Sequence, residues 1–473
     1  MKAEEYINLG YQRLTTFEVD GGGFSLFGDA PADRMLTAYG LQEFSDMARV
    51  HAVDEAIIER AAQWLLAQQS ANGSWEPDQG LVHEDIWVGL DRLPVTAYVV
   101  WSLVDAGYGD DPRVEQGLSY VREFRSQGGD AYVLALVANA LVAGTPDEGT
   151  TQQALDALAE AAVRNGNVVY WPSGVATMMG SRGETGSIET TALAAYALIR
   201  AGAYPDLANG ALTYLMQHKD SHGTWYSTQA TILSLKALLL SVHNAAERVD
   251  ATVRVSFNGR SADPIRVTTE NYDVVQVVSF DDISADTANS VHIRVEGEGN
   301  LMYQVAGSYY LPWADVPPTP AEQELITIDV DYDRRELTVN DTVEVGVTVA
   351  LNQPGGVAEW VLVDLGVPPG FQVLAEDLNA LVARDTDRPA DYEGPRIKRY
   401  ELTGRQVLVY VEGLSEGLPL TFRYRLRARY PIVAQTPASR VYDYYNPDVA
   451  DTRAPQTLTV LPTQPAFGDE KGE

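Results

Sequence analysis

One plan recurs four times in the first half of the chain: a loop with an aromatic residue, followed by an alanine-rich helix. The loops are Gly22-Gly23-Phe24, Gly73-Ser74-Trp75, Tyr170-Trp171 and Gly223-Thr224-Trp225. The helices that follow them are expected to begin near Thr37, Thr96, Thr191 and Ala230. Small alanine side chains let helices approach closely, and helix pairs repeated at such intervals are typical of a closed or stacked helical array.

Apolar residues between these loops follow the helical period. Ile58, Ala61, Ala62, Leu65 and Leu66 fall at i, i+3, i+4, i+7 and i+8, which places them on one helix face. Three glycines stand where left-handed helix C-caps are expected: Gly107, Gly144 and Gly202.

One of the aromatic loops also fits a known structural turn. The segment Gln69-x3-Gly73-x-Trp75 matches the QW-type turn of helical toroids with the terpene-cyclase shape. In those folds the turn ties one helix end to the next, so its role is structural rather than catalytic.

Near residue 249 the period changes from helical to alternating, which indicates β-strands. Strands are expected in two groups, separated by a proline-rich linker at 312–320. The first group is 252–257, 274–280, 291–295 and 302–310; the second is 325–330, 343–351, 358–365, 407–412, 421–430 and 439–445. Short strands with Gly and Pro between them favour an antiparallel sandwich, with one helix inserted at 375–384.

Charge and composition exclude several functions. The formal net charge of −32 predicts repulsion from nucleic acid and from anionic membrane surfaces. The absence of cysteine excludes disulfides, thiolate metal sites and a cysteine nucleophile in this chain. No stretch approaches the roughly 20 apolar residues of a membrane span, and residues 1–6 lack the apolar core of a signal peptide.

His83 is the residue most suited to chemistry, although a lone histidine beside carboxylates is more often an ordinary surface residue. It lies in a polar turn between two helices of the array, at 80–85. His218 and His222 are four apart, but no third metal ligand is evident, so no metal site is predicted. Three carboxylates could instead supply the acid and base of a glycoside hydrolase built on a helical toroid: Glu84, Asp85 and Glu189.

Five segments, in this order, resemble the C-terminal region of the α2-macroglobulin and complement thioester-protein family. They are Tyr6 to Arg13, Gly22 to Gly28 followed by Leu36 to Tyr39, Gly223 to Gln229, Glu296 to Gly299, and Val441 to Tyr445. Together they extend the resemblance over nearly the whole chain.

The resemblance implies a multidomain fold, α then β. It places an α/α-toroid thioester-type domain, truncated at its N-terminus, at 1–248 and a CUB-like β segment at 249–314. A linker follows at 315–323, then a macroglobulin receptor-binding-type β-sandwich at 324–463 and a tail at 464–473. The Cys-Gly-Glu-Gln thioester and the bait region of the family would then lie upstream of Met1.

The resemblance also assigns a role to His83. Its loop aligns with the one where complement-type members place a thioester-activating histidine, so His83 is predicted to be catalytic if an upstream thioester exists. The implied function is the C-terminal part of an endopeptidase inhibitor that traps proteases, rather than an enzyme. No cofactor or metal is implied.

Partners and location follow from the same resemblance. The implied partners are target endopeptidases, bound through the full-length protein, and the upstream macroglobulin domains. The implied location is extracellular or in the cell envelope. A carbohydrate-active hydrolase with accessory sandwiches, and a binding or adhesion module, remain the alternative interpretations.

Overall fold

The computed structural model describes residues 2–25, 28–78, 91–178, 180–219, 224–245, 249–272, 274–284, 287–299, 301, 303–307, 309–316, 325–352, 356–389 and 391–462. We refer to these as the described residues. They form two compact units, the first made mainly of residues up to 308 and the second mainly of residues from 309. The chain is thus a helical part followed by antiparallel sheets, as the sequence predicts. The domain limits given above stay a prediction.

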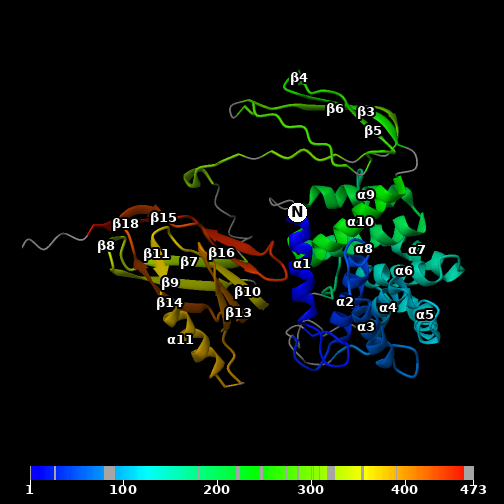
Figure 1. The fold of residues 1–473 in the computed structure, drawn as a ribbon, viewed down its shortest axis with the longest axis horizontal. Coiled ribbons are helices and arrows are strands. Elements are labelled where there is room, and N and C mark those ends of the chain that lie inside the picture. Colours follow the sequence, from blue (N-terminus) through cyan, green and yellow to red (C-terminus); the bar gives the residue numbers. More distant parts are fainter. Residues whose placement is uncertain are drawn as a thin grey trace, which may run out of the picture. The chain divides into compact units, whose positions relative to one another are not determined.

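Ten α-helices make up most of the first unit (Figure 1). They are α1 (Lys2–Thr15), α2 (Arg34–Met47), α3 (Glu55–Ala67), α4 (Arg92–Leu103), α5 (Pro112–Phe124), α6 (Ala131–Gly144), α7 (Gly149–Glu160), α8 (Gly183–Ala201), α9 (Pro205–Gln217) and α10 (Thr228–Ala245). Three short elements connect some of them: a π-helical segment η1 (Val104–Tyr108), a 3-10 turn η2 (Arg125–Gln127), and a hairpin of β1 (Val163–Asn165) and β2 (Val168–Tyr170).

Burial separates inner helices from outer ones. Every residue of α4 from Leu93 to Leu103 is buried, and α6 and α8 are buried over most of their length. Helices α3, α5 and α7 bury only one face, at i, i+3 and i+4 spacing. Helices apolar all round need neighbours on every side, so α4, α6 and α8 line the inside of the array.

Contacts between the even-numbered helices close the array into a ring. The Gln42 amide on α2 donates to Ser102 Oγ on α4 at 3.1 Å, and α4 packs on α6. The Asn139 amide on α6 then donates to the Leu193 carbonyl on α8 at 3.0 Å.

The ring continues from α8 through α10 back to α2. Ser227, directly before α10, donates to Glu189 Oε1 on α8 at 3.3 Å. Lys236 Nζ on α10 lies 2.7 Å from Asp46 Oδ2 on α2. This ring is the α/α toroid that the sequence predicts.

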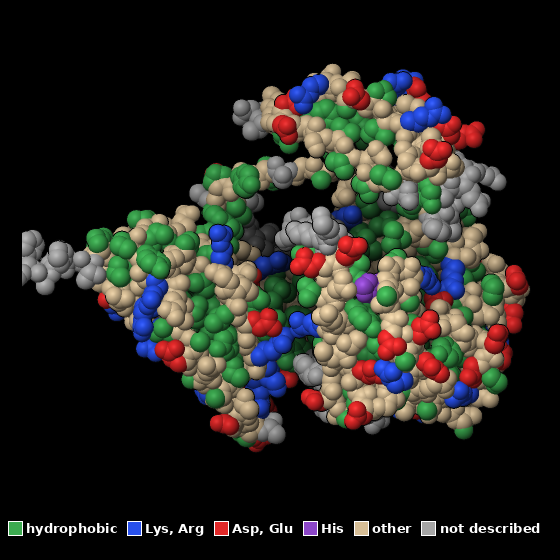
Figure 2. All heavy atoms as spheres, in the orientation of Figure 1, with side chains coloured by type: hydrophobic (Ala, Val, Ile, Leu, Met, Phe, Trp, Pro, Cys, Tyr) green, Lys and Arg blue, Asp and Glu red, His purple; other side chains and the backbone are tan. Residues whose placement is uncertain are grey.

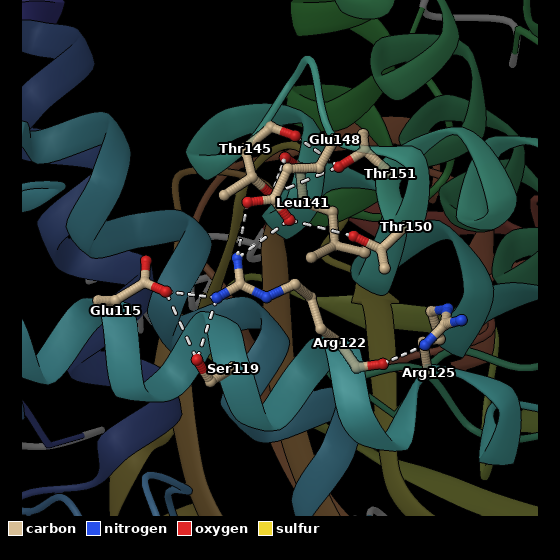
Figure 3. A network of polar contacts seen from close by, with 9 residues as sticks. All are labelled: Glu115, Ser119, Arg122, Arg125, Leu141, Thr145, Glu148, Thr150 and Thr151. Carbon is tan, nitrogen blue, oxygen red and sulfur yellow. Dashed lines mark hydrogen bonds and ion pairs between the residues drawn. The ribbon is translucent and has the colours of Figure 1, made fainter.

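A polar network on the outside fastens α5 to the start of α7 (Figure 3). The Arg122 guanidinium binds Glu115, donates to Ser119 Oγ at 3.0 Å, and lies 3.3 Å from Glu148 Oε2. Glu148 is the N-cap of α7 and accepts from Thr150 Oγ1 at 3.2 Å. One arginine therefore joins two outer helices through charge-assisted hydrogen bonds.

Two local predictions need correction. Helix α8 begins at Gly183, well before the expected start near Thr191, because burial of Thr185 and Ile188 outweighs the low helix propensity of the glycines. Gly144 is the last residue of α6 and not a left-handed C-cap. Its lack of a side chain matters for packing, since a Cβ there would come within 2.7 Å of Leu118. Gly202 does follow α8 with a φ of 62°.

A small sheet follows the toroid in the first unit. It contains β3 (Asp250–Phe257), β4 (Arg260–Ser261), β5 (Ile265–Thr268) and β6 (Val291–Glu298), with β3 between β6 on one side and β4 and β5 on the other. The predicted strands at 274–280 and 302–310 are wrong: the described residues there belong to no strand. Valines such as Val275, 85% exposed, favour a strand, but a strand exists only where a second one pairs with it.

The second unit is an antiparallel β-sandwich with one helix. Its strands are β7 (Ile326–Tyr332), β8 (Glu336–Thr338), β9 (Thr342–Leu351), β10 (Val357–Gly366), β11 (Phe371–Val373), β12 (Arg396–Leu402), β13 (Gln406–Ser415), β14 (Leu420–Ala428), β15 (Ile432–Gln435), β16 (Ser439–Asp443), β17 (Ala450–Arg453) and β18 (Thr457–Leu461). The turn η4 (Trp313–Asp315) precedes them, and α11 (Ala375–Thr386) lies between β11 and β12.

Two sheets enclose the core of this sandwich (Figure 1). Their strand orders are β12-β13-β10-β16-β17 and β11-β14-β9-β7. Strands β9 and β14 alternate buried apolar residues with outward polar ones, which puts Val345, Val347, Phe422 and Tyr424 in the core. A third, smaller sheet orders β15-β18-β8, where β18 and β8 are parallel. The second group of predicted strands and the inserted helix are confirmed.

Candidate functional site

Each aromatic loop of the toroid joins the end of an outer helix to the start of an inner one. In the loop between α3 and α4, the Trp75 indole N–H donates to the Leu65 carbonyl at 2.7 Å, in the last turn of α3. The Trp75 backbone N–H donates to Thr96 Oγ1 at 3.0 Å, near the start of α4. The side chain is 0% exposed, so it fills the space between the two helices. The Leu65 carbonyl also accepts from the Gln68 N–H at 3.0 Å, so the indole adds a second hydrogen bond at the helix end.

The other loops repeat these bonds. The Trp171 indole donates to the Leu158 carbonyl and its backbone N–H to Thr191 Oγ1, at 2.6 Å and 3.0 Å. The Trp225 indole donates to the Leu215 carbonyl at 2.6 Å. Its backbone N–H donates to Thr231 Oγ1 in the helix that follows. Phe24, without an indole, keeps only the backbone bond, to Thr37 Oγ1 at 2.9 Å.

Gln69 confirms the predicted QW-type turn. Its amide donates to the Gly73 carbonyl at 3.0 Å and to the Arg113 carbonyl, in the first turn of α5, at 2.7 Å. Gly73 has a φ of 87°, and a Cβ there would meet the Gln116 carbonyl oxygen at 2.6 Å, so glycine is required.

These turns gather one set of loops at the end of the toroid where the inner helices begin. In the sequence, His83 stands between Trp75 and α4. His83 lies outside the described residues, as do Glu84 and Asp85, so the role predicted for His83 stays a prediction.

Directly before residues 79–90, Asp78 is bound to the N-terminus of α2. Asp78 Oδ2 accepts from the Arg34 backbone N–H at 2.6 Å, and Asp78 Oδ1 pairs with the Arg34 guanidinium. Asp33, the N-cap of α2, accepts from the Leu36 N–H at 2.8 Å. Burial, the Asp78 charge and a hydrogen bond with Asp78 raise the pKa of Asp33 to about 7.

Glu189 belongs to a second buried cluster below the same loops. Its side chain is 1% exposed and accepts from Ser227 Oγ. Burial, followed by the charge of Glu189, raises the pKa of Tyr132, whose hydroxyl accepts from the Met178 N–H at 2.9 Å. Burial also raises the pKa of Glu43 on α2, which is hydrogen-bonded to Tyr39. The cluster places the Glu189 carboxyl group inside the toroid, away from solvent, whereas Glu43 is partly exposed.

Of the two histidines spaced four apart, only His218 lies among the described residues. His218 is the C-cap of α9, stacks on the Tyr214 ring at 3.8 Å, and has Nδ1 2.8 Å from the Tyr214 carbonyl. His222 lies outside the described residues. Across the described part of the chain, no group of three or more His, Asp or Glu could hold a metal ion.

Sequence reasoning missed the Asp33 cluster. Asp33 stands directly before a helix, which is an N-cap signal visible in the sequence. Asp78 lies 44 residues from Arg34 and carries no such signal, so only the folded chain brings them together.

A helical toroid with aromatic turns, followed by antiparallel sheets, defines the class of this chain. Family models agree with that class. The model of the A-macroglobulin TED domain matches residues 1–240, and that of the A-macroglobulin receptor binding domain matches residues 356–455. The chain belongs to the α-macroglobulin family.

Solved structures share the fold at low identity. Native α2-macroglobulin from Escherichia coli, from domain MG7 to the C-terminus, is 19% identical with a TM-score of 0.62 over 96% of this chain and 67% of that one. A native E. coli α2-macroglobulin structure gives 19% identity and a TM-score of 0.63, over 98% of this chain and 27% of that one. Salmonella α2-macroglobulin reacted with methylamine is 18% identical with a TM-score of 0.58, over 95% of this chain and 27% of that one. The chain thus spans 27% of these longer proteins.

Proposed function

We propose that this chain is the C-terminal part of an α2-macroglobulin-like endopeptidase inhibitor, which captures proteases rather than turning over a substrate. The supporting observation is the order of the two family matches, thioester-type toroid first and receptor-binding sandwich second. A thioester needs a cysteine, and this chain has none, so the thioester would come from a segment upstream of Met1. Target endopeptidases and upstream macroglobulin domains are its proposed partners.

Within that function, His83 is proposed to activate the thioester. The imidazole nitrogen attacks the thioester carbonyl, which forms an acyl-imidazole and releases the cysteine thiolate. A hydroxyl of the target then attacks the acyl-imidazole, the thiolate accepts the hydroxyl proton, and imidazole leaves. The family resemblance of its loop, residues 80–84, supports this role.

The test uses this chain together with the segment encoded directly upstream of it. An endopeptidase is added, and its hydrolysis of a large protein and of a small amide substrate is measured. Capture should stop hydrolysis of the protein substrate while the small substrate, which can still reach the active site, continues to be cleaved. Unchanged hydrolysis of the protein substrate at excess inhibitor would contradict the proposal.

The hydrolase alternative is disfavoured by burial. Glu189, at 1% exposure, is enclosed by the inner helices and is not placed to meet a polysaccharide. An extracellular or cell-envelope location is part of the proposal and rests on the family alone. A membrane-spanning helix is not found in the described part of the chain.

The visible surface of the toroid mixes acidic and basic side chains (Figure 2). In the whole chain, acidic residues outnumber basic ones by 66 to 34.

A further inference from the structure

We propose that Asp33, Arg34 and Asp78 form a proton-dependent clasp, which fastens the chain that leaves Trp75 to the N-terminus of α2. The clasp joins two of the loops at the end of the toroid where the inner helices begin. It is a property of the toroid itself and does not depend on the inhibitor function.

Arg34 supplies the permanent part of the clasp. The Asp78 carboxylate accepts from two groups of Arg34: the backbone N–H, at 2.6 Å, and the guanidinium. The two side chains are 22% and 12% exposed, so water competes little for these bonds. The Arg34 guanidinium also reaches Gln68 Oε1, at the C-cap of α3, at 3.5 Å.

Asp33 supplies the part that depends on a proton. Its Oδ1 accepts from the Leu36 N–H, and its backbone N–H donates to the Phe24 carbonyl at 2.8 Å, so its position is fixed. The next residue, Arg34, donates its backbone N–H to Asp78, so the carboxyl groups of Asp33 and Asp78 lie at the same helix N-terminus. Two carboxylates there repel each other, and a proton on one of them relieves the repulsion and lets it donate to the other.

The electrostatics assign the proton to Asp33. Burial, followed by the Asp78 charge, raises its pKa from 3.8 to about 7, against a lowering by the N–H groups of Leu36 and Met35. Burial also raises the pKa of Asp78, but Arg34 and the hydrogen bond from Asp33 lower it. Arg34 is thus the cation facing the pair, and Asp78 stays the ionised partner.

The sign of the pH dependence follows. The folded state holds the Asp33 proton more tightly than the unfolded state, where the pKa is near 3.8. The stabilisation from Asp33 is therefore complete below pH 3.8, declines as the pH rises towards 7, and is lost above it. Above that pH, two buried carboxylates repel each other and Asp78 is held by Arg34 alone.

The experiment measures amide hydrogen exchange at Arg34, whose N–H donates to Asp78. Rates at about pH 6 and about pH 8 are corrected for the intrinsic pH dependence. A group with a pKa of about 7 changes from about 90% to about 10% protonated over this interval. The deprotonated fraction therefore rises about tenfold, and we expect the corrected exchange rate at Arg34 to rise by the same factor. Asp33→Asn should abolish the rise, since an amide donates to Asp78 and accepts from Leu36 without titrating.

Asp54→Asn is the matched control. Asp54 caps α3, accepting from the Ala56 N–H at 3.0 Å, and is not paired with a carboxylate in the structure. This variant should keep the wild-type rise at Arg34. Asp78→Asn is the second variant, and it should also abolish the rise because it removes the repulsion at high pH. A rise of wild-type size in both Asp33→Asn and Asp78→Asn, or none in the wild type, would overturn the proposal.

Discussion

The Asp385 carboxylate holds together the end of α11 and the start of β12. Its side chain is 0% exposed, and it accepts from Arg384 Nε at 2.8 Å and from the Ile397 N–H at 2.8 Å. Arg388 Nε lies 2.9 Å away on the same carboxylate. A fully enclosed charge with this many donors is costly to remove, because the Ile397 N–H and the partly buried Arg388 guanidinium lose the acceptor that they share.

We therefore expect Asp385→Ala to lower the free energy of unfolding by about 3–5 kcal/mol. Urea denaturation followed by fluorescence provides the measurement. Asp387→Ala is the control, since this exposed carboxylate two residues away should change stability by about 0.5 kcal/mol or less. A loss at Asp385 no larger than at Asp387 would show that the buried carboxylate is dispensable.

His83→Asn tests the role proposed for the histidine, in a protein that includes the upstream segment. Asparagine keeps the size and polarity but removes the nucleophile, so transfer should shift from hydroxyls to amines, which attack a thioester directly. The measurement is the ratio of ester-linked to amide-linked products, with glycerol and methylamine as competing acceptors. An unchanged ratio would show that His83 does not activate the thioester and is an ordinary surface residue.

The residue scale shows the limits of prediction from sequence. His83 was found through the family resemblance, since its local sequence alone favours a surface residue. Asp33 could have been expected as a helix cap, but its elevated pKa comes first from burial and then from the Asp78 charge, and nothing local indicates either. Chemistry that depends on a distant partner is invisible in a local pattern.

At the scale of elements, the aromatic turns are the joints of the toroid. Trp171 illustrates the general case: it is 0% exposed and bonded to the helix before it and the helix after it. Trp171→Phe should lose the indole hydrogen bond and part of the buried volume. Thr191→Val should leave the Trp171 N–H buried without an acceptor.

We expect each of these two changes to lower the stability of the first unit by about 1–3 kcal/mol. Trp313→Phe is a matched control, because Trp313 is 47% exposed and outside the toroid. Thermal denaturation followed by circular dichroism at a helical wavelength gives the result. If the unfolding midpoints of both variants equalled that of the control, the turns would not contribute to the stability of the toroid.

At the scale of the whole molecule, the chain should not inhibit proteases by itself. Covalent capture needs the thioester cysteine, which the chain does not contain, and the family resemblance places the cleavable bait upstream of Met1. Titration against a panel of endopeptidases should leave cleavage of protein substrates intact. Stoichiometric inhibition by this chain would mean that capture works without either part.

The two compact units predict a site for limited proteolysis. Brief digestion should cut first in the proline-rich segment 312–320, where few backbone hydrogen bonds are expected, and leave a sandwich fragment starting nearby. Mass spectrometry of the fragments locates the cut. A resistant fragment that runs unbroken through this segment would argue against independent units.

The sequence by itself determined whether each region is helical or made of strands. Helical and alternating periods reflect which face of an element is buried, and that information is local. The change of period near residue 249, the aromatic loops and the helix at Ala375–Thr386 were all visible in this way. Tertiary structure alone decided which distant groups pair. It joined Trp171 to Thr191 and Arg34 to Asp78, and it started α8 at Gly183. It also left the valine-rich stretch 274–280 without a strand to pair with. Hydrogen bonding and burial need two partners, and a local pattern describes only one of them.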